Sequence, residues 1–128
     1  MTPRPGSQAD ATARMAKARQ FADAAALFYD DTTGSADLPD AYVTTAVHSG
    51  IAAADVVCIR RLGAYQASGA HQEAVALLKR ADADASKHLS RLLSLKSKAG
   101  YSANPASRAD VDAARRAHLA LLEAAESA

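Results

Sequence analysis

Two groups of side chains in this sequence have the residue types and spacing to bind a ligand. The first lies between residues 91 and 101, where Arg91, Lys96, Lys98 and Tyr101 follow one another along an expected helix and its end. Lysine and arginine contact phosphate groups, and a neighbouring aromatic ring can stack on a base. Cations near a helix C-terminus also offset the helix dipole, so these residues have a purely structural explanation as well.

The second group is an acid and an imidazole that interrupt apolar segments. Asp55 stands between Ala54 and Val56, and His71 opens the segment that follows a glycine-containing turn. A buried carboxylate needs a partner. Asp55 therefore either forms a salt bridge or faces solvent at the edge of the fold, or it belongs to a polar pocket. His71 is either a local packing residue or a second member of that pocket.

The four histidines do not have the spacing of a metal site. They are His48, His71, His88 and His118, and no two of them have three residues between them, as two zinc ligands on one helix face do. The Glu-x-x-His pairs of a di-iron bundle are also missing. We expect no metal and no cofactor, and neither a phosphate-binding glycine loop nor a catalytic triad is indicated. His118 falls on an apolar stripe and is expected to be a core histidine with its hydrogen bonds satisfied.

Composition indicates one small helical domain. The chain has 128 residues, and 34 of them are alanine, the best helix former, while aromatic residues make up only 5%. A core rich in alanine requires helices that approach one another closely. The formal net charge of +1 excludes a strongly basic nucleic-acid-binding surface over the whole protein, so any phosphate binding must come from a local patch.

The single cysteine and the N-terminus bear on the compartment. Cys58 stands alone in an apolar run, so no intramolecular disulfide can form, and we expect a small buried side chain in a reducing cytoplasm. The first six residues are polar and are not followed by the apolar stretch of a signal peptide. The sequence also suggests no apolar stretch near the roughly 20 residues that span a membrane, so we expect no membrane contact.

The pattern of apolar residues predicts an all-α, up-and-down bundle of four to five helices. We expect a flexible tail over residues 1–8 and one bundle domain over residues 9–127. The expected helices cover about residues 9–30, 37–62, 71–80, 84–97 and 107–126, with loops over 64–70 and 100–106. Acidic residues near position 82 separate the third and fourth helices, although one kinked helix fits the pattern as well.

Several residues mark helix ends or helix contacts. Ser7 or Asp10 can cap the first helix, and Ser107, with an acid three residues later, can cap the last. Gly63 suits the end of the second helix. Gly50 lies in the middle of that helix, where a glycine costs about 1 kcal/mol relative to alanine. A close approach of a neighbouring helix would explain it.

Three segments together resemble a known family. They are AVHSGIAAADVVCIRRLG over residues 46–63, HQEAVALLKR over residues 71–80, and the stretch from Leu89 to Ala125 that includes Lys96, Lys98 and Tyr101. In this order they resemble the bacterial branch of the HEPN superfamily, the "higher eukaryotes and prokaryotes nucleotide-binding" domains. The resemblance implies a four- to five-helix bundle, a homodimer and, in many relatives, ribonuclease activity or a nucleotidyltransferase partner.

The sequence departs from the catalytic signature of that family, an arginine followed by four to six residues and a histidine. Arg80 and His88 have seven residues between them, and Arg115 and His118 have two. We therefore expect a non-catalytic relative that binds nucleic acid, a nucleotide or a protein partner. One alternative is a divergent ribonuclease or toxin with His71 or His88 as general base. Another is a purely structural protein that presents an apolar helix face to a partner.

Overall fold

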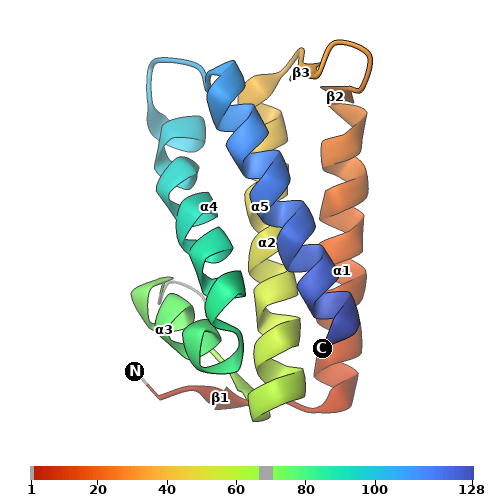
Figure 1. The fold of residues 1–128 in the computed structure, drawn as a ribbon, viewed down its shortest axis with the longest axis vertical. Helices are drawn as coiled ribbons and strands as arrows, with labels where there is room; N and C mark the ends of the chain where they lie inside the picture. Colours follow the sequence, from red (N-terminus) through yellow and green to blue (C-terminus); the bar gives the residue numbers. More distant parts are fainter. Residues whose placement is uncertain (1, 67–70) are drawn as a thin grey trace.

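The computed structural model describes residues 2–66 and 71–128, which form a bundle of α-helices (Figure 1). Short antiparallel ladders join β1 (Arg4–Pro5) to β4 (Ala64–Tyr65) and β2 (Tyr29–Asp30) to β3 (Ser35–Ala36). The predicted all-α bundle is confirmed. The helices of the described part are α1 (Gln8–Leu27), α2 (Pro39–Leu62), α3 (His71–Ala81), α4 (Ala83–Tyr101) and α5 (Arg108–Ser127).

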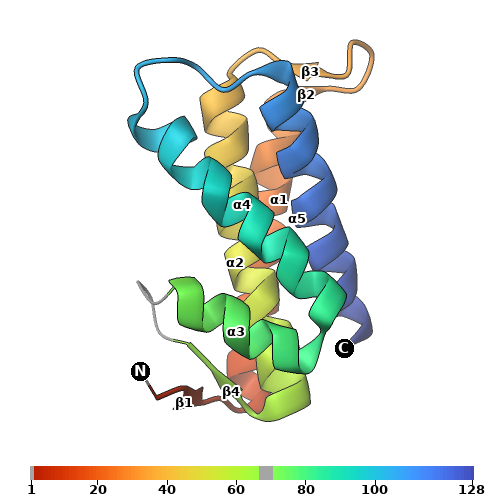
Figure 2. The same cartoon turned by 60° about the vertical axis from the view of Figure 1, so that its left-hand side comes forward.

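The long helices run alternately up and down, and α2 lies at the centre of the bundle. In Figure 1, α5 crosses in front of α2, with α4 on one side and α1 on the other, and Figure 2 shows the short α3 against the lower part of α2. Within the described residues α2 packs against each of the other helices, whereas α1 and α4 are not packed against each other. One side of α2, between α1 and α4, is therefore less covered than the rest.

Local sequence explains where α2 begins and ends. Pro39 occupies the start of the helix, where its missing N–H group is no loss. Gly63 ends the helix with φ of 71°, a left-handed conformation that glycine adopts without strain, and its N–H donates to the carbonyl of Ile59 at 2.8 Å. Most residues between these ends are small or β-branched and buried, so the core of the bundle is largely the surface of α2.

Gly50 is the point at which three helices meet. A Cβ atom built at Gly50 would overlap Cδ1 of Leu92 from α4 and would lie 3.1 Å from Cδ1 of Leu121 from α5. Both leucines are completely buried and cannot easily move aside. One residue earlier, the hydroxyl of Ser49 donates to the carbonyl of Ala18 in α1 at 2.9 Å. The close approach expected from a glycine in the middle of a helix is present.

The ends of the other helices follow the expected signals, with two exceptions. The first helix was expected to reach residue 30, but α1 ends at Leu27, because Tyr29 and Asp30 pair with Ala36 and Ser35. Ser7 and Ser107 each form a capping box with the aspartate three residues later, and Asp82 caps α4, which makes α3 and α4 separate helices. The prediction that the loop begins at residue 100 is wrong, because α4 continues to Tyr101. Gly100 lowers helix propensity but leaves the backbone hydrogen bonds intact, so it does not end the helix.

Residues 4–7 differ from the flexible tail expected over residues 1–8. Arg4 and Pro5 pair with Tyr65 and Ala64, and the N–H of Gly6 donates to the carbonyl of Gly63 at 3.0 Å. The backbone just after α2 leaves hydrogen-bonding groups unpaired, and the N-terminal segment satisfies them. Of the loop expected over residues 64–70, residues 64–65 form β4, and residues 67–70 lie outside the described part of the chain.

By length and composition α2 could cross a membrane. The expectation that the sequence has no apolar stretch of that length is therefore wrong. It has 24 residues, and 72% of its most apolar window is buried inside the bundle. Among the described residues no second helix meets the same criteria. The packing of the other helices around α2 accounts for its apolar character, as in the core helix of a bundle.

Replacing Gly50 with alanine should destabilise the protein although alanine is the better helix former. Overpacking costs about 1–3 kcal/mol, and the overlap with Leu92 places this substitution in the upper part of that range, at about 2–3 kcal/mol, against a gain of about 1 kcal/mol in helix propensity. We expect urea unfolding to show a loss of about 1–2 kcal/mol. Gly100→Ala is the matched control, because nothing lies within 4 Å of a Cβ there, and it should raise stability slightly. A Gly50→Ala variant as stable as the wild type would contradict the close contact.

Candidate functional site

Between α1 and α4, one strip of the surface of α2 is left accessible to side chains of other elements and to ligands. Its residues recur every three or four positions and so share one face of the helix: Thr44, His48, Ile51 and Asp55. Thr44 and His48 are exposed, and Ile51 and Asp55 are partly buried. We call these four residues the open face of α2. Side chains of α1, α3 and α4 line its two edges, and several of the residues singled out from the sequence are among them.

Asp55 is paired with an arginine of α1. Its Oδ2 lies 3.2 Å from Nη1 of Arg14, and the side chain of Asp55 is only 16% exposed. The guanidinium of Arg14 also stacks over the ring of Tyr65, with 4.3 Å from Cζ to the ring centroid. Tyr65 is held by the β1–β4 ladder, so the N-terminal segment helps to fix the ion pair. The salt bridge expected as one explanation of Asp55 is therefore present.

Burial outweighs the salt bridge in setting the acidity of Asp55. Loss of hydration raises its pKa, the charge of Arg14 lowers it, and the result is a pKa of about 6. A carboxyl with this pKa changes its protonation state near neutral pH, unlike an exposed aspartate. Among the described carboxyl groups with a shifted pKa, Asp55 has a raised one, whereas Asp10 and Asp110 have lowered ones. A raised pKa is common at functional sites and makes Asp55 a candidate for one.

Asp55 and His71 line one small cavity between α2, α3 and α4. The cavity offers about 30 Å³ to the centres of water molecules, which is room for about two waters. Cys58 also lines it, but burial and the charge of Asp55 raise the pKa of this thiol to about 12, so it stays protonated. Leu89 and Leu93 form part of the apolar wall. The structure thus brings Asp55 and His71 to one cavity, whose lining is mostly apolar and which is too small for anything larger than water.

His71 connects this cavity to a lysine of α4. Nζ of Lys96 lies 3.2 Å from Nε2 of His71. A lysine ammonium can only donate, so Nε2 of His71 accepts and the ring proton is on Nδ1. The contact joins the first residue of α3 to the last part of α4 and holds the Lys96 ammonium beside the open face of α2.

Lys96 also lines a larger surface pocket with Tyr101 and three residues of α2, among them Val47. This pocket offers about 160 Å³ to water centres and lies between α2 and the end of α4. Thr44 and His48 form its other side, and the ring of Tyr101 is 85% exposed. The ring of His48 stacks on that of Phe21 from α1, with 5.2 Å between centroids. A cation, an exposed phenol ring and an imidazole therefore surround one opening.

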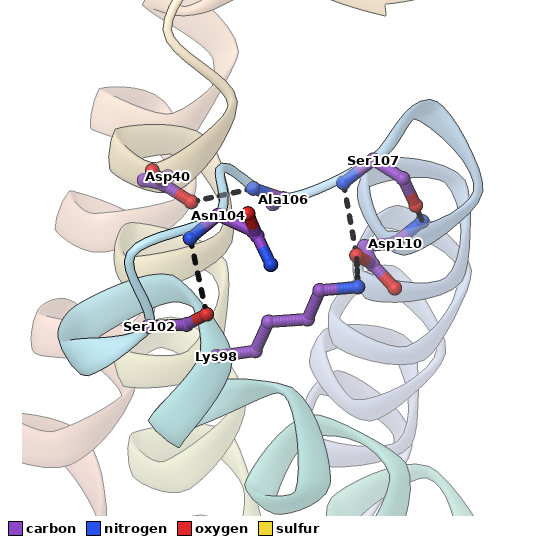
Figure 3. A network of polar contacts seen from close by, with 7 residues as sticks. All are labelled: Asp40, Lys98, Ser102, Asn104, Ala106, Ser107 and Asp110. Atoms are coloured by element: carbon purple, nitrogen blue, oxygen red, sulfur yellow. Dashed lines mark hydrogen bonds and ion pairs between the residues drawn. The ribbon is translucent and has the colours of Figure 1, made fainter.

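Lys98 does not belong to this pocket. Its Nζ lies 2.7 Å from Oδ2 of Asp110, the same carboxylate that receives the N–H of Ser107 in the cap of α5 (Figure 3). This contact and the hydrogen bond to Ser107 lower the pKa of Asp110 to about 2. Figure 3 also shows Asp40 of α2 accepting the N–H of Ala106, which fixes the preceding loop. Lys98 thus fastens α4 to α5, and its charge is already compensated.

Arg91 also lies away from the open face of α2. At about 100° per residue, Arg91 and Lys98 fall on nearly the same side of α4, whereas Lys96 is about 140° away from Arg91. The side chain of Arg91 is exposed, and no described residue forms a hydrogen bond or ion pair with it. Of the six residues singled out from the sequence, the structure brings together Asp55, His71, Lys96 and Tyr101.

Three residues at this site were not singled out from the sequence. Arg14 pairs with Asp55, Tyr65 supports Arg14, and His48 lines the pocket of Lys96 and Tyr101. His48 could have been found, because it is seven residues before Asp55 and shares its helix face. Arg14 and Tyr65 come from other elements, and no spacing along the chain relates them to Asp55.

A second polar cluster lies on the opposite side of α2. The hydroxyl of Tyr42 is 3.4 Å from Nε2 of His118, and both side chains are buried. Nδ1 of His118 has no hydrogen-bond partner among the described residues, so the expectation of a fully satisfied core histidine is wrong. Burial, helped by the nearby charge of Arg115, lowers the pKa of His118 to about 4 and keeps the ring neutral.

The surroundings of the histidines bear on the metal site and on the nuclease alternative. No group of three or more His, Cys, Asp or Glu side chains could hold a metal ion in this part of the chain. Within the same residues, His71 contacts Lys96 rather than an arginine, and the side chain of His88 has no described hydrogen bond or ion pair. The arginine and histidine that do act on each other are Arg115 and His118, with the histidine buried.

No family model, curated protein or solved structure matches this chain. The class that the structure defines is the all-α helical bundle. Since one fold supports many functions, the function must be inferred from the chemistry of its surface.

Asp55 and His118 should have opposite effects on stability below neutral pH. The folded protein binds a proton at Asp55 more tightly than the unfolded chain does, so Asp55 adds stability as pH falls from about 6 to 4. The pKa of His118 is lower in the folded state, so His118 removes stability as pH falls from about 6.5 to 4. In the wild-type protein these two slopes largely cancel.

Asp55→Asn should reveal the slope of His118. Between pH of about 6.5 and 4.5, urea unfolding of the variant should show a loss of about 2–3 kcal/mol that the wild type lacks, at 1.36 kcal/mol for each pKa unit. Groups such as Asp110 contribute to both proteins alike, so the difference between the two curves isolates Asp55. Parallel curves would mean that the carboxyl has an ordinary pKa in the folded state.

Proposed function

We propose that this protein is a non-catalytic, HEPN-like bundle that acts by binding, and that its ligand is a nucleotide or a short single-stranded nucleic acid. The observation that carries the proposal is the pocket at the open face of α2, where Lys96, Tyr101 and His48 surround one opening. A lysine ammonium binds a phosphate as a point charge, and an exposed aromatic ring stacks on a base of any identity.

The distribution of charge limits the size of the ligand. Arg14 is compensated by Asp55 and Lys98 by Asp110, which leaves the ammonium of Lys96 as the uncompensated permanent charge lining the pocket. One or two phosphate contacts are therefore expected, rather than the extended track of a protein that covers a long strand. This agrees with the net charge of +1 for the whole chain.

On the basis of the HEPN resemblance, the proposal also includes assembly into a homodimer and binding of a protein partner. The described surface has a few exposed apolar side chains that could join two copies, among them Leu27 at 86% exposure and Leu38 at 57%. A purely structural role is the alternative that these side chains favour. It requires no ligand in the pocket of Lys96, so binding measurements separate the two.

Labelled total cellular RNA, run on a gel at low and at moderate salt, tests binding and cleavage together. We expect a salt-sensitive shift without cleavage, since the sequence lacks the arginine–histidine signature of the nucleases and His71 contacts Lys96 rather than an arginine. Cleavage that disappears on substitution of His71 or His88 would instead support the ribonuclease alternative. A gel that shows no shift and no cleavage would contradict the proposal and would direct the search to a protein partner.

Substitutions at the pocket should weaken binding of an oligouridylate in distinct ways. Lys96→Gln removes one phosphate contact, so the slope of log K against log salt should become shallower by about 1. Tyr101→Ala removes one stacking surface and should weaken binding about 10-fold at all salt concentrations, within the range measured for stacking of one base.

Arg91→Gln is the matched control for Lys96→Gln. It removes one positive charge from the same helix, but on a side that does not face the pocket. Fluorescence anisotropy should therefore give the same affinity and the same salt slope as the wild type. Equal losses from Arg91→Gln and Lys96→Gln would show that general charge, and not the pocket, attracts the oligonucleotide.

A further inference from the structure

The cluster around His118 forms a second pocket, separate from the open face of α2. It lies between α1, α2 and α5 beside the β2–β3 ladder and offers about 100 Å³ to water centres. On α2 it is lined by Tyr42, which at about 100° per residue lies on the opposite side of the helix from Thr44. The two pockets therefore open on different faces of the bundle and share no lining residue.

The inner end of this pocket is neutral and incompletely hydrogen-bonded. His118 is 3% exposed and Tyr42 is 2% exposed, and the only hydrogen bond described for either side chain is the long one of 3.4 Å between them. Nδ1 of His118 is left without a partner in the described residues. A buried polar atom without a hydrogen bond costs free energy, so a small movement of this ring that brings Nδ1 to a polar atom of a bound molecule would be stabilising.

The mouth of the pocket carries one cation with free hydrogen-bonding capacity. The guanidinium of Arg115 lies over the ring of Tyr29, with 4.7 Å from Cζ to the ring centroid. The described acid that pairs with it is Asp31, at 3.8 Å, beyond hydrogen-bond distance, and the side chain of Asp31 is 89% exposed. Asp112, three residues before Arg115 on α5, also acts on Tyr42 but forms no ion pair with Arg115 within 4 Å. A loose ion pair of this kind is worth little, so another carboxylate can replace it.

The remaining wall of the pocket is apolar. Ala22 and Ala26 of α1 line one side and Leu119 of α5 the other, with Leu119 still 41% exposed. The pocket thus has a cation at its mouth, a neutral inner end and an apolar wall. A molecule that fits it has an anionic group for Arg115, an oxygen near His118 and Tyr42, and a short apolar part between the alanines and the leucine. A single guanidinium matches a monoanion, and its planar fork matches a carboxylate.

We propose that the pocket formed by Tyr42, Arg115 and His118 is a binding site for a short-chain carboxylate. Arg115 holds the carboxylate through paired N–H donors, and the carbon chain lies against Ala22, Ala26 and Leu119. The site does not depend on the nucleic-acid-binding function proposed for the open face of α2.

Titration of the labelled protein with acetate, propionate and inorganic phosphate at constant ionic strength and neutral pH tests the site. The ring signals of His118 should shift in a saturable way with propionate. Propionate should bind more tightly than acetate, by up to about fourfold for one buried methylene. No saturable shift at about 100 mM propionate would overturn the proposal, and so would tighter binding of phosphate than of propionate.

Two neighbouring arginines provide the variant and its control. Arg115→Gln should weaken propionate binding at least tenfold, whereas Arg116→Gln removes the same charge from an exposed neighbour and should leave it unchanged. Arg115→Lys keeps the charge without the planar fork and should give an intermediate affinity. Arg115→Gln and Arg115→Lys both retain a long polar side chain at a half-exposed position, so folding should persist. Equal binding by Arg115→Gln and the wild type would overturn the assignment.

Discussion

The close approach of α4 and α5 to α2 at Gly50 is the constraint on which the rest of the structure depends. Leu92 and Leu121 occupy the volume that a side chain at this position would take. Alanine and serine along α2 allow similar contacts with α1, as the hydrogen bond from Ser49 to Ala18 shows. Dispersion contacts between tightly packed small residues thus replace the large aromatic core that this chain lacks.

The same packing decides where a ligand can reach the centre of the bundle. Because α1 and α4 do not pack against each other, one face of α2 stays open, and its polar residues meet side chains from three other helices. Most of the charges nearby already serve the fold. Arg14 compensates a buried carboxylate, and Lys98 completes the cap of α5. Lys96 is held beside the open face by a neutral imidazole, which leaves its charge available.

Local features of the structure could be predicted from the sequence because they depend on neighbouring residues. Capping by Ser107, the end of α2 at Gly63 and the close contact at Gly50 each follow from the conformational preference of one residue. The docking of residues 4–6 could not be predicted, since backbone pairing between distant segments leaves no pattern in side chains. The extension of α4 through Gly100 depended on a propensity difference too small to fix a boundary.

The candidate site could be predicted only in part for a similar reason. Lys96 and Lys98 look alike in sequence, but the helix turns them to different sides, and only the position of Asp110 shows which charge is compensated. Asp55 and His71 come from different helices, and their meeting at one cavity depends on how α3 packs against α2. The partly unsatisfied His118 depends on the position of Tyr42, seventy-six residues away.

The most direct test of the account is to map an oligouridylate of about eight nucleotides onto the protein by NMR. Amide signals of the labelled wild-type protein would be followed during the titration. If the open face of α2 is the binding surface, the largest shifts will cluster at His48, Lys96 and Tyr101 and leave the exposed side of α5 unchanged. Shifts centred on α5, or an unchanged spectrum at saturating oligonucleotide, would contradict it.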